Sequence, residues 1–391
     1  MARYLFPTLG SLGDLRPAIA VAAAIQRAGD QAAIASGPEH RALVERHGLE
    51  FVPLGDEAYL RDARMGAAIH HPRHGGRAFI HFSNIRQLDR ITDELMAAAE
   101  GAAAIVAPPL MVPAPLVAAA LDRPLIGYCI SVAAYALDRR DRPPDALVLR
   151  WRSVIAATRS RLGLPPMDQP ERESFDAPSH ILGLFPKFVP TAWTGRSIEV
   201  VGFPILPAES AELPQGLADW MAQNRFVLFT FGSHVDEGVK RFATMARAAC
   251  RSLGLACLFQ TVRSEAVADL AGADMRIERF VPMPPVLSRA AAVVHHGGLG
   301  TSAEVLRAGV PAVIMPFMHD QPFNAIVLFR ADFAERLEPA QCSSERLADA
   351  LRRAIANGER RRRRAASVDI GVGEHIADAV AARLRRIVGA P

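Results

Sequence analysis

Cysteine is scarce in this sequence, which has four in 391 residues: Cys129, Cys250, Cys257 and Cys342. No two of them form a Cys-x-x-Cys pair. The number and spacing therefore exclude both the disulfide framework of a small secreted domain and a structural zinc site. We expect these thiols to be reduced and to lie in the core.

Lysine is almost missing, because 43 of the 45 basic residues are arginine. The formal net charge of +4 is modest for this length and excludes nucleic-acid binding as the expected role. The basic excess is local: from Glu345 to the C-terminus there are 11 arginines and 6 acids, with Arg360–Arg364 as an unbroken run. Such a run predicts a solvated face, or alternatively a weak peripheral contact with an anionic inner membrane surface.

Long apolar runs are also few. The N-terminal run is short before charges return at Asp14 and Arg16, so we expect no secretory signal and a cytoplasmic location. Residues 101–121 are 21 uncharged residues, long enough to cross a bilayer. Prolines interrupt this segment, which favours a strand, a loop and a short helix: Pro108, Pro109, Pro113 and Pro115.

The pattern that is present is an alternation of short apolar strands with amphipathic helices. This order predicts parallel sheets with helices on both faces, in two Rossmann-like domains. In the first half we expect strands at Tyr4–Pro7, Gln31–Ala35, Glu50–Pro53, Ala103–Ala107 and Leu125–Cys129, and helices at Leu15–Arg27 and Glu39–His47. In the second half we expect strands at Arg225–Phe231, Ala256–Thr261, Met275–Phe280, Ala292–His295 and 312–315, and helices at Lys240–Leu253, 302–308, 322–330 and 344–356.

The domain boundaries follow from the breaks in this pattern. Phe203–Gly216 contains prolines and no periodicity, as expected of a linker. Two polar segments, 56–90 and 138–178, are predicted as insertions that form a ligand crevice. We predict an acceptor-binding domain at 1–205, a linker at 206–216, a donor-binding domain at 217–372, and a C-terminal helix at 373–391 that packs back on the first domain.

Val293–Ala325 is the most informative segment. A short strand delivers two histidines onto a glycine-rich turn, and a helix starts near Gly300. Free N–H groups and the helix dipole at such a start bind anions. His296 can donate a hydrogen bond to a phosphate there, and glycines permit close backbone approach at Gly297, Gly298 and Gly300. The turn therefore predicts a diphosphate site.

Further polar residues follow this turn. Glu304 lies one helical turn beyond Thr301, within reach of ribose hydroxyls. Asp320 and Gln321 follow the next strand, where a carboxylate beside an amide can bind a hexose. Each residue alone has an ordinary structural explanation, such as a helix-surface Glu or an N-capping Asp. Their order together favours a nucleotide-sugar site. A dinucleotide dehydrogenase is disfavoured, because the first turn is GxxGD rather than GxGxxG.

In this order of residues, Val293–Ala325 resembles the donor-binding signature of nucleotide-sugar-dependent glycosyltransferases. This family includes the plant and animal UDP-glycosyltransferases, the sterol glucosyltransferases and the bacterial antibiotic glycosyltransferases. The resemblance extends over nearly the whole chain and includes Gly10–Pro17, Val201–Pro204 and Phe231–Ser233. Among family members the chain most resembles the rhamnosyltransferase B chain of rhamnolipid synthesis, through Gly48–Glu57, Leu182–Pro186 and HDQPFNA.

The resemblance implies the GT-B fold, an α/β architecture of two Rossmann-like doubly wound domains facing across a cleft. It implies a UDP- or dTDP-linked sugar as co-substrate and no other cofactor. Plant members carry Trp and Gln where this chain has Phe280 and Met283, so the base stays open between uracil and thymine. The donor-binding residues that it implies are Gly13, Ser233, Phe280, Val281, His296, Gly298, Gly300, Thr301, Glu304, Asp320 and Gln321.

The family's chemistry implies roles for both domains. Family members invert the anomeric centre in one displacement, which needs a base for the acceptor and stabilisation of the leaving diphosphate. Plant members have a His as base in the first glycine-rich turn. Asp14 occupies that position here, as in bacterial antibiotic and sterol transferases, and its alternative role is to cap a helix starting at Leu15. Because the sequence has no Asp-x-Asp metal clamp, no metal requirement is expected.

Acceptor and metal candidates are less well defined. Tyr128 and Tyr135 are predicted to line an apolar acceptor pocket, with a place in the core as the alternative. Their segment follows a strand, as an acceptor loop would. The mixed spacing of a histidine cluster, without nearby carboxylates, favours a solvated or acceptor-lining loop over a metal site: His70, His71, His74 and His81.

The leading prediction is an inverting transferase that moves a hexose or deoxyhexose to a hydroxyl of an apolar acceptor, such as a hydroxy-fatty acyl lipid or a polyketide. A GT-B epimerase is the alternative within the enzymes. It would convert the sugar nucleotide alone, without acceptor. A two-lobed binding protein is the alternative outside the enzymes, and would normally carry an export signal.

Overall fold

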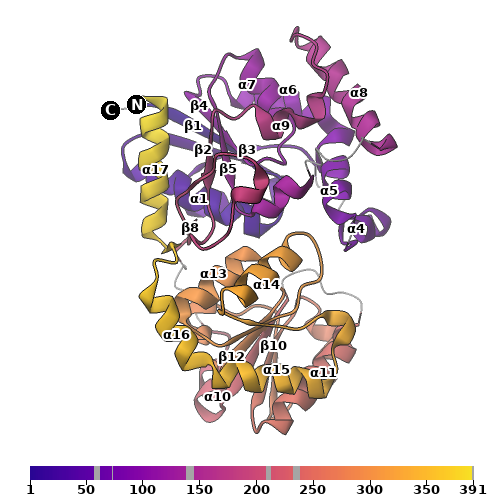
Figure 1. The fold of residues 1–391 in the computed structure, drawn as a ribbon, viewed down its shortest axis with the longest axis vertical. Helices are drawn as coiled ribbons and strands as arrows, with labels where there is room; N and C mark the ends of the chain where they lie inside the picture. The colour runs from indigo at the N-terminus through magenta and orange to yellow at the C-terminus, as the bar shows by residue number, and fades with distance from the viewer. Residues whose placement is uncertain (57–61, 73, 138–144, 208–212, 232–237, 390–391) are drawn as a thin grey trace. The chain divides into compact units, whose positions relative to one another are not determined.

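The computed structural model describes residues 1–56, 62–72, 74–137, 145–207, 213–231 and 238–389. The chain divides into two compact units, each with its own sheet and core (Figure 1). Unit 1 comprises Met1–Leu206 and Gly371–Pro391, and unit 2 comprises Pro207–Ile370.

Unit 1 is built on a seven-stranded parallel sheet with the order β3-β2-β1-β4-β5-β6-β7. The chain winds outward in one direction from β1 and then in the other from β4. The carboxyl ends of these two strands are therefore the switch point, where ligands bind in open α/β sheets. The strands are β1 (Arg3–Pro7), β2 (Gln31–Ser36), β3 (Glu50–Pro53), β4 (Ala104–Ala107), β5 (Leu125–Cys129), β6 (His180–Gly183) and β7 (Glu199–Val200).

Helices cover both faces of this sheet. One apolar core lies beneath α1 and α17, and another beneath α6 and α7. The helices of unit 1 are α1 (Leu12–Arg27), α2 (Arg41–Arg46), α4 (Ala63–Ile69), α5 (Gly75–Ser83), α6 (Leu88–Ala98), α7 (Pro113–Ala120), α8 (Ala146–Arg161), α9 (Glu173–Asp176) and α17 (His375–Val388).

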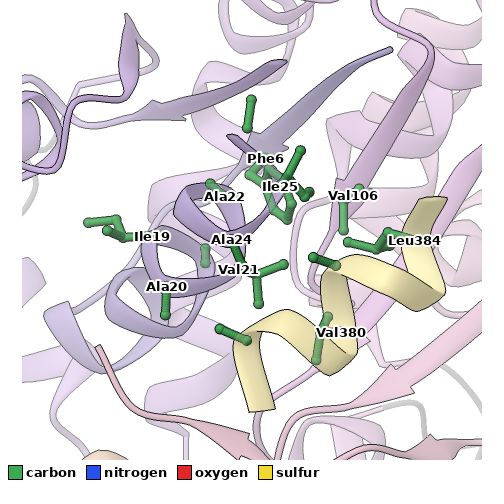
Figure 2. Close-up of a cluster of buried hydrophobic side chains, with 14 of the residues drawn as sticks. Phe6, Ile19, Ala20, Val21, Ala22, Ala24, Ile25, Val106, Val380 and Leu384 are labelled. Atoms are coloured by element: carbon green, nitrogen blue, oxygen red, sulfur yellow. The ribbon is translucent and has the colours of Figure 1, made fainter. Parts of the chain in front are cut away.

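Helix α17 is the last helix of the chain and packs against α1 (Figure 2). Val380 and Leu384 are buried in the same core as Phe6 and Val21. Arg385 Nε donates to Asp30 Oδ2 at 2.8 Å. The chain thus returns to the first unit after completing the second.

Two expectations about local structure need correction in unit 1. Helix α1 begins at Leu12 rather than Leu15, because Ser11 supplies the N-cap. The predicted insertions 56–90 and 138–178 contain α4, α5 and α8, and residues of α5 and α8 pack in a small core with α7. Phe203–Pro204, placed in the linker, forms a strand, β8, that pairs with β15 (Val372–Gly373).

Unit 2 has a six-stranded parallel sheet of order β11-β10-β9-β12-β13-β14, with its switch point between β9 and β12. Helices α11 and α15 cover one core of this unit. Its strands are β9 (Phe226–Thr230), β10 (Ala256–Gln260), β11 (Met275–Glu278), β12 (Ala292–His295), β13 (Ala312–Ile314) and β14 (Glu335–Arg336). Its helices are α10 (Leu217–Gln223), α11 (Val239–Ser252), α12 (Met283–Leu287), α13 (Leu299–Ala308), α14 (Gln321–Arg330), α15 (Ser344–Ala356) and α16 (Gly358–Ser367).

The arginine run forms most of α16, and its members are bound within unit 2. Arg361 is 7% exposed and donates to Glu335 at 2.7 Å and to Asp332 at 3.2 Å. Arg363 pairs with Glu359 on the same helix, and Arg364 donates to the Ala331 carbonyl. The run is therefore solvated, as the sequence predicted, at every position except Arg361, which is buried.

Membrane and cysteine expectations can also be compared with the structure. Residues 101–121 form β4, a loop and α7, as expected. Within the described ranges, no helix combines the length and apolar character needed to span a bilayer. Cys129, Cys250 and Cys257 are buried free thiols, and Cys342 is half-buried.

Candidate active site

The glycine-rich turn of unit 2 follows β12 at the switch point of the sheet. His295 is buried, and its Nδ1 accepts the Gly297 N–H at 3.2 Å. This bond requires an unprotonated Nδ1, and burial lowers the pKa of His295 to about 3. Gly297 has φ +89°, and a Cβ there would lie 2.8 Å from Ile314 Cγ2. The turn is therefore fixed by a neutral histidine and by a position that only glycine fits.

His296 follows directly and is half-buried. Burial lowers its pKa to about 4, opposed by an interaction with the Thr230 backbone, so the imidazole is neutral at pH 7. Its Nδ1 is buried and has no hydrogen-bond partner among the described residues. Such an atom is destabilising unless a ligand satisfies it. The structure therefore favours His296 as a neutral hydrogen-bond donor over His296 as a charged one.

Helix α13 starts immediately after this turn, with Gly298 as N-cap and no side chain capping it. Ser302 Oγ turns back to the Gly298 carbonyl at 3.0 Å, so it does not cap the first N–H groups. Apart from its own helix backbone and its chain neighbours, no heavy atom of the described residues lies within 4 Å of the position that a Gly300 Cβ would take. The start of α13, including Thr301, thus presents uncapped N–H groups beside open space, as an anion site requires.

Glu304 lies on the same helix, half-buried, with its carboxylate in an ion pair. Its Oε2 accepts from Arg307 Nη2 at 2.8 Å. Sequence reasoning missed Arg307, although its i,i+3 spacing from Glu304 was a usable signal. A ribose bound by Glu304 would share the carboxylate with this arginine.

Asp320 and Gln321 open α14, and the structure separates their roles. Asp320 is half-buried, and its Oδ2 accepts from Asn324 Nδ2 at 2.8 Å. Gln321 is 4% exposed, and its Oε1 accepts the backbone N–H groups of Phe317 and Met318 at 2.9 and 3.2 Å. The preceding turn therefore occupies the Gln321 amide oxygen, and the predicted contact of Gln321 with the sugar stays a prediction for its NH2 group.

Asn324 is a residue that sequence reasoning missed. Its Nδ2 also donates to the Gly297 carbonyl at 3.0 Å. One buried amide thereby links the glycine-rich turn after β12 to Asp320 at the start of α14. Its i,i+4 spacing from Asp320 on a helix was the signal available.

Phe280 follows β11 and is 58% exposed, whereas the next residue, Val281, is fully buried. An exposed aromatic ring held by a buried neighbour is a suitable stacking surface for a planar base. β11 lies three strands from β12 along the same sheet edge, a span of about 14 Å at the usual strand spacing. An extended nucleoside diphosphate suits that span better than a lone phosphate. Ser233, also predicted for the donor, lies outside the described residues.

The remaining predicted site residues lie in unit 1. Asp14 is the third residue of α1, in the loop and helix start that follow β1. Its Oδ2 accepts from both the N–H and the Oγ of Ser11 at 3.0 Å, forming a capping box. Asp14 is therefore not the N-cap itself. The adjacent Gly13 donates its N–H to Ser11 Oγ at 3.2 Å.

Tyr128 and Tyr135 are core residues, at 2% and 5% exposure. Tyr135 packs on Phe175 and beneath the Arg196 guanidinium. Burial raises the pKa of both phenols. The expectation that they line an acceptor pocket is wrong, because their strand and the following turn point them into the sheet core.

The histidine cluster is dispersed in the structure. The His71 and His74 rings stack at 4.9 Å, and His81 Nδ1 lies 3.4 Å from Trp151 Nε1. Across the part of the chain that the structure describes, no three His, Cys, Asp or Glu side chains gather as a metal site would require.

Two parallel doubly wound sheets, one with a glycine-rich turn and an uncapped helix start at its switch point, are typical of the GT-B class of two-domain proteins. Comparisons with known proteins agree with this class. Residues 256–384 match the family model for the C-terminal domain of erythromycin biosynthesis protein CIII-like proteins. In overall structure the chain is similar to the glycosyltransferase VinC in complex with dTDP, with a TM-score of 0.72, 20% identity and full coverage of both chains.

Relatives in sequence cover most of the chain. Glycosyltransferase GtfC of Amycolatopsis orientalis is 28% identical over 83% of each chain. O-mycaminosyltylonolide 6-deoxyallosyltransferase of Streptomyces fradiae is 28% identical over 91% of this chain and 90% of its own. The resemblance read from the motifs is confirmed: this chain is a glycosyltransferase with the GT-B fold, and it is similar in sequence to glycosyltransferases of antibiotic biosynthesis. These relatives do not favour the epimerase alternative.

Proposed function

We propose that this enzyme transfers a hexose or deoxyhexose from a dTDP- or UDP-sugar to a hydroxyl of an apolar natural product or lipid, with inversion and without a metal ion. The observation that carries the proposal is the edge of the unit 2 sheet. There the exposed Phe280 ring and the uncapped start of α13, with the unpartnered His296 Nδ1, suit the two ends of a nucleoside diphosphate. The dTDP bound to VinC and the deoxysugar named for the Streptomyces fradiae relative support the donor class.

In this mechanism unit 2 binds the leaving group. The N–H groups at the start of α13 and neutral His296 hydrogen-bond the diphosphate as negative charge develops on it. Asp320, held by Asn324, accepts from sugar hydroxyls. Glu304 accepts from the ribose, with Arg307 keeping its carboxylate in place.

Unit 1 supplies the base. The Asp14 carboxylate takes the proton of the acceptor hydroxyl as the oxygen attacks the anomeric carbon. The bond to the acceptor oxygen forms while the bond to the diphosphate oxygen breaks. A single displacement of this kind inverts the anomeric centre.

Binding of dTDP and UDP, measured by calorimetry, tests the donor site. We expect saturable binding of both nucleotides, and His296→Ala should weaken it by about 10- to 100-fold, the effect of removing a hydrogen bond to a charged group. His296→Asn keeps a donor near the position of Nδ1, so it should lose less. Equal affinities for the wild type and His296→Ala would contradict the diphosphate role.

Activity in excess chelator tests metal independence. Because the helix start and His296 can stabilise the diphosphate, we expect the release of dTDP from dTDP-glucose to keep its full rate in EDTA. The measurement is the initial rate before and after chelation, with added Mg²⁺ or Mn²⁺ as the control. A rate that EDTA abolishes and divalent ions restore would overturn this part of the proposal.

A further inference from the structure

A group of buried polar side chains lies beneath the first turn of α1 in unit 1. Thr8 follows β1 and is 1% exposed. Its N–H donates to the Ala35 carbonyl at 2.9 Å, and its own carbonyl accepts from Ser36 Oγ at 2.8 Å. Ser36 Oγ also lies 3.0 Å from His40 Nδ1. The Thr8 backbone is therefore held on both sides, and only its side chain can adjust.

Tyr128 reaches the same place from β5. Side chains alternate along strands, so Phe6 and Thr8 share one face of the sheet, and Tyr128 lies on that face with Phe6 and Val106. β5 is two strands from β1, about 10 Å away, a distance that a tyrosine side chain can largely span. Helix α1 packs on this face, because its Leu15 and Ala18 share the core with Phe6 and Tyr128. Burial raises the pKa of Tyr128, an interaction with the Thr8 side chain opposes that rise, and the Asp14 charge adds to it. Thr8 and Tyr128 therefore lie on the face of the sheet that the start of α1, with Asp14, covers.

Neither hydroxyl is satisfied in the fold. Among the described residues, Thr8 Oγ1 and Tyr128 Oη are buried and form no hydrogen bond. Buried hydroxyls without partners destabilise a fold, and such atoms in a native protein call for an explanation. Their nearness to the proposed base points to a role in catalysis.

We propose that Thr8 and Tyr128 are positioning residues for Asp14, with Tyr128 Oη donating to Thr8 Oγ1 and the Thr8 hydroxyl donating to the Asp14 carboxylate. This inference rests on the proposed function of Asp14 as base. The relay complements the capping box: Ser11 holds Asp14 Oδ2 from the loop, and Thr8 supports the ionised carboxylate from the core. The relay only positions the carboxylate. Thr8 and Tyr128 keep their protons, because Asp14 exchanges a proton with the acceptor hydroxyl alone.

Tyr128→Phe and Thr8→Val test the relay, measured as dTDP release from dTDP-glucose with water and with 1-octanol as acceptors. We expect kcat to fall about 10- to 100-fold, because the base is no longer held in place, while the KM for the donor stays unchanged. Losing a donor to the carboxylate raises the Asp14 pKa, so the acidic limb of the kcat profile should move to higher pH. Thr8→Ser keeps the hydroxyl and should restore most of kcat.

Tyr4→Phe is the matched control. Tyr4 lies on the same sheet face, fully buried, and its Oη also has no partner within the described ranges. Its surroundings are Asp30 and Arg385, at the other end of β1 from Thr8. Removing this hydroxyl should leave kcat and the pH profile unchanged.

The outcomes separate the relay from the base assignment. If Tyr128→Phe and Thr8→Val match Tyr4→Phe in kcat and in the acidic limb, the relay is overturned. Asp14→Asn is measured in the same series. If that variant is fully active, the base assignment in the proposed function fails, whatever the two hydroxyl variants show.

Discussion

Asp14→Asn is expected to lower kcat about 10³-fold, while the affinity for dTDP stays within a factor of about two. The amide cannot accept the acceptor's proton, whereas the proposed nucleotide site lies in a different unit of the chain. The substitution retains a side-chain oxygen in place of Oδ2, which accepts from the N–H and hydroxyl of Ser11. The helix start should therefore be preserved. Single-turnover kinetics and calorimetry with dTDP provide the two measurements.

Loss of a helix cap could by itself lower stability, so a substitution that removes a cap elsewhere serves as the control for Asp14→Asn. Ser343 caps α15 by accepting the Arg346 N–H at 3.2 Å. Ser343→Ala should lower the Tm, at a cost of about 1 kcal/mol, and leave kcat unchanged. A near-normal kcat for Asp14→Asn would instead leave this carboxylate with the capping box as its only role.

Arg361→Met is expected to destabilise the protein by about 3 to 5 kcal/mol. Arg361 is 7% exposed and pairs with Glu335, which is also 7% exposed. Methionine fills much of the same volume but leaves Glu335 with Arg353, whose side chain is 57% exposed. A buried carboxylate that loses its enclosed partner is costly. Urea unfolding of the full chain measures the loss.

Arg363→Met is the matched control on the same helix. Its side chain is 79% exposed and pairs with Glu359, so the loss should be below about 1 kcal/mol. The double variant Arg361→Met/Glu335→Leu should recover much of the stability, because an apolar pair can replace a buried ion pair. Equal losses for Arg361→Met and Arg363→Met would show that the arginine run is only a solvated face.

Much of the fold followed from patterns that act locally. Short apolar runs separated by amphipathic helices predicted parallel sheets in both halves, and strands such as Glu50–Pro53 and Ala292–His295 have the predicted bounds. The helix starts were less accurate. Helix α1 begins at Leu12, three residues before the expected start, because Ser11 rather than Asp14 supplies the N-cap.

The donor site was predictable where residue type and spacing carry the chemistry. The two histidines, the glycines and the uncapped helix start after β12 form the turn that the sequence predicts, and anion binding there stays a prediction. The bonds from the Phe317 and Met318 N–H groups to Gln321 could not be predicted, because they depend on how the preceding turn folds. Asn324 was missed because one of its two bonds reaches a turn 27 residues away.

The sequence by itself determined the α/β class, the order of the elements and the glycosyltransferase motifs, since these depend on periodicity and on short-range spacing. The tertiary structure alone decided which polar groups are satisfied. It placed most of the arginine run in ion pairs, Tyr128 and Tyr135 in the core, and the buried hydroxyls of Thr8 and Tyr128 without hydrogen-bond partners among the described residues. Burial and partners depend on segments that only the folded chain brings together, and these two quantities set the charge state and the role of each polar residue.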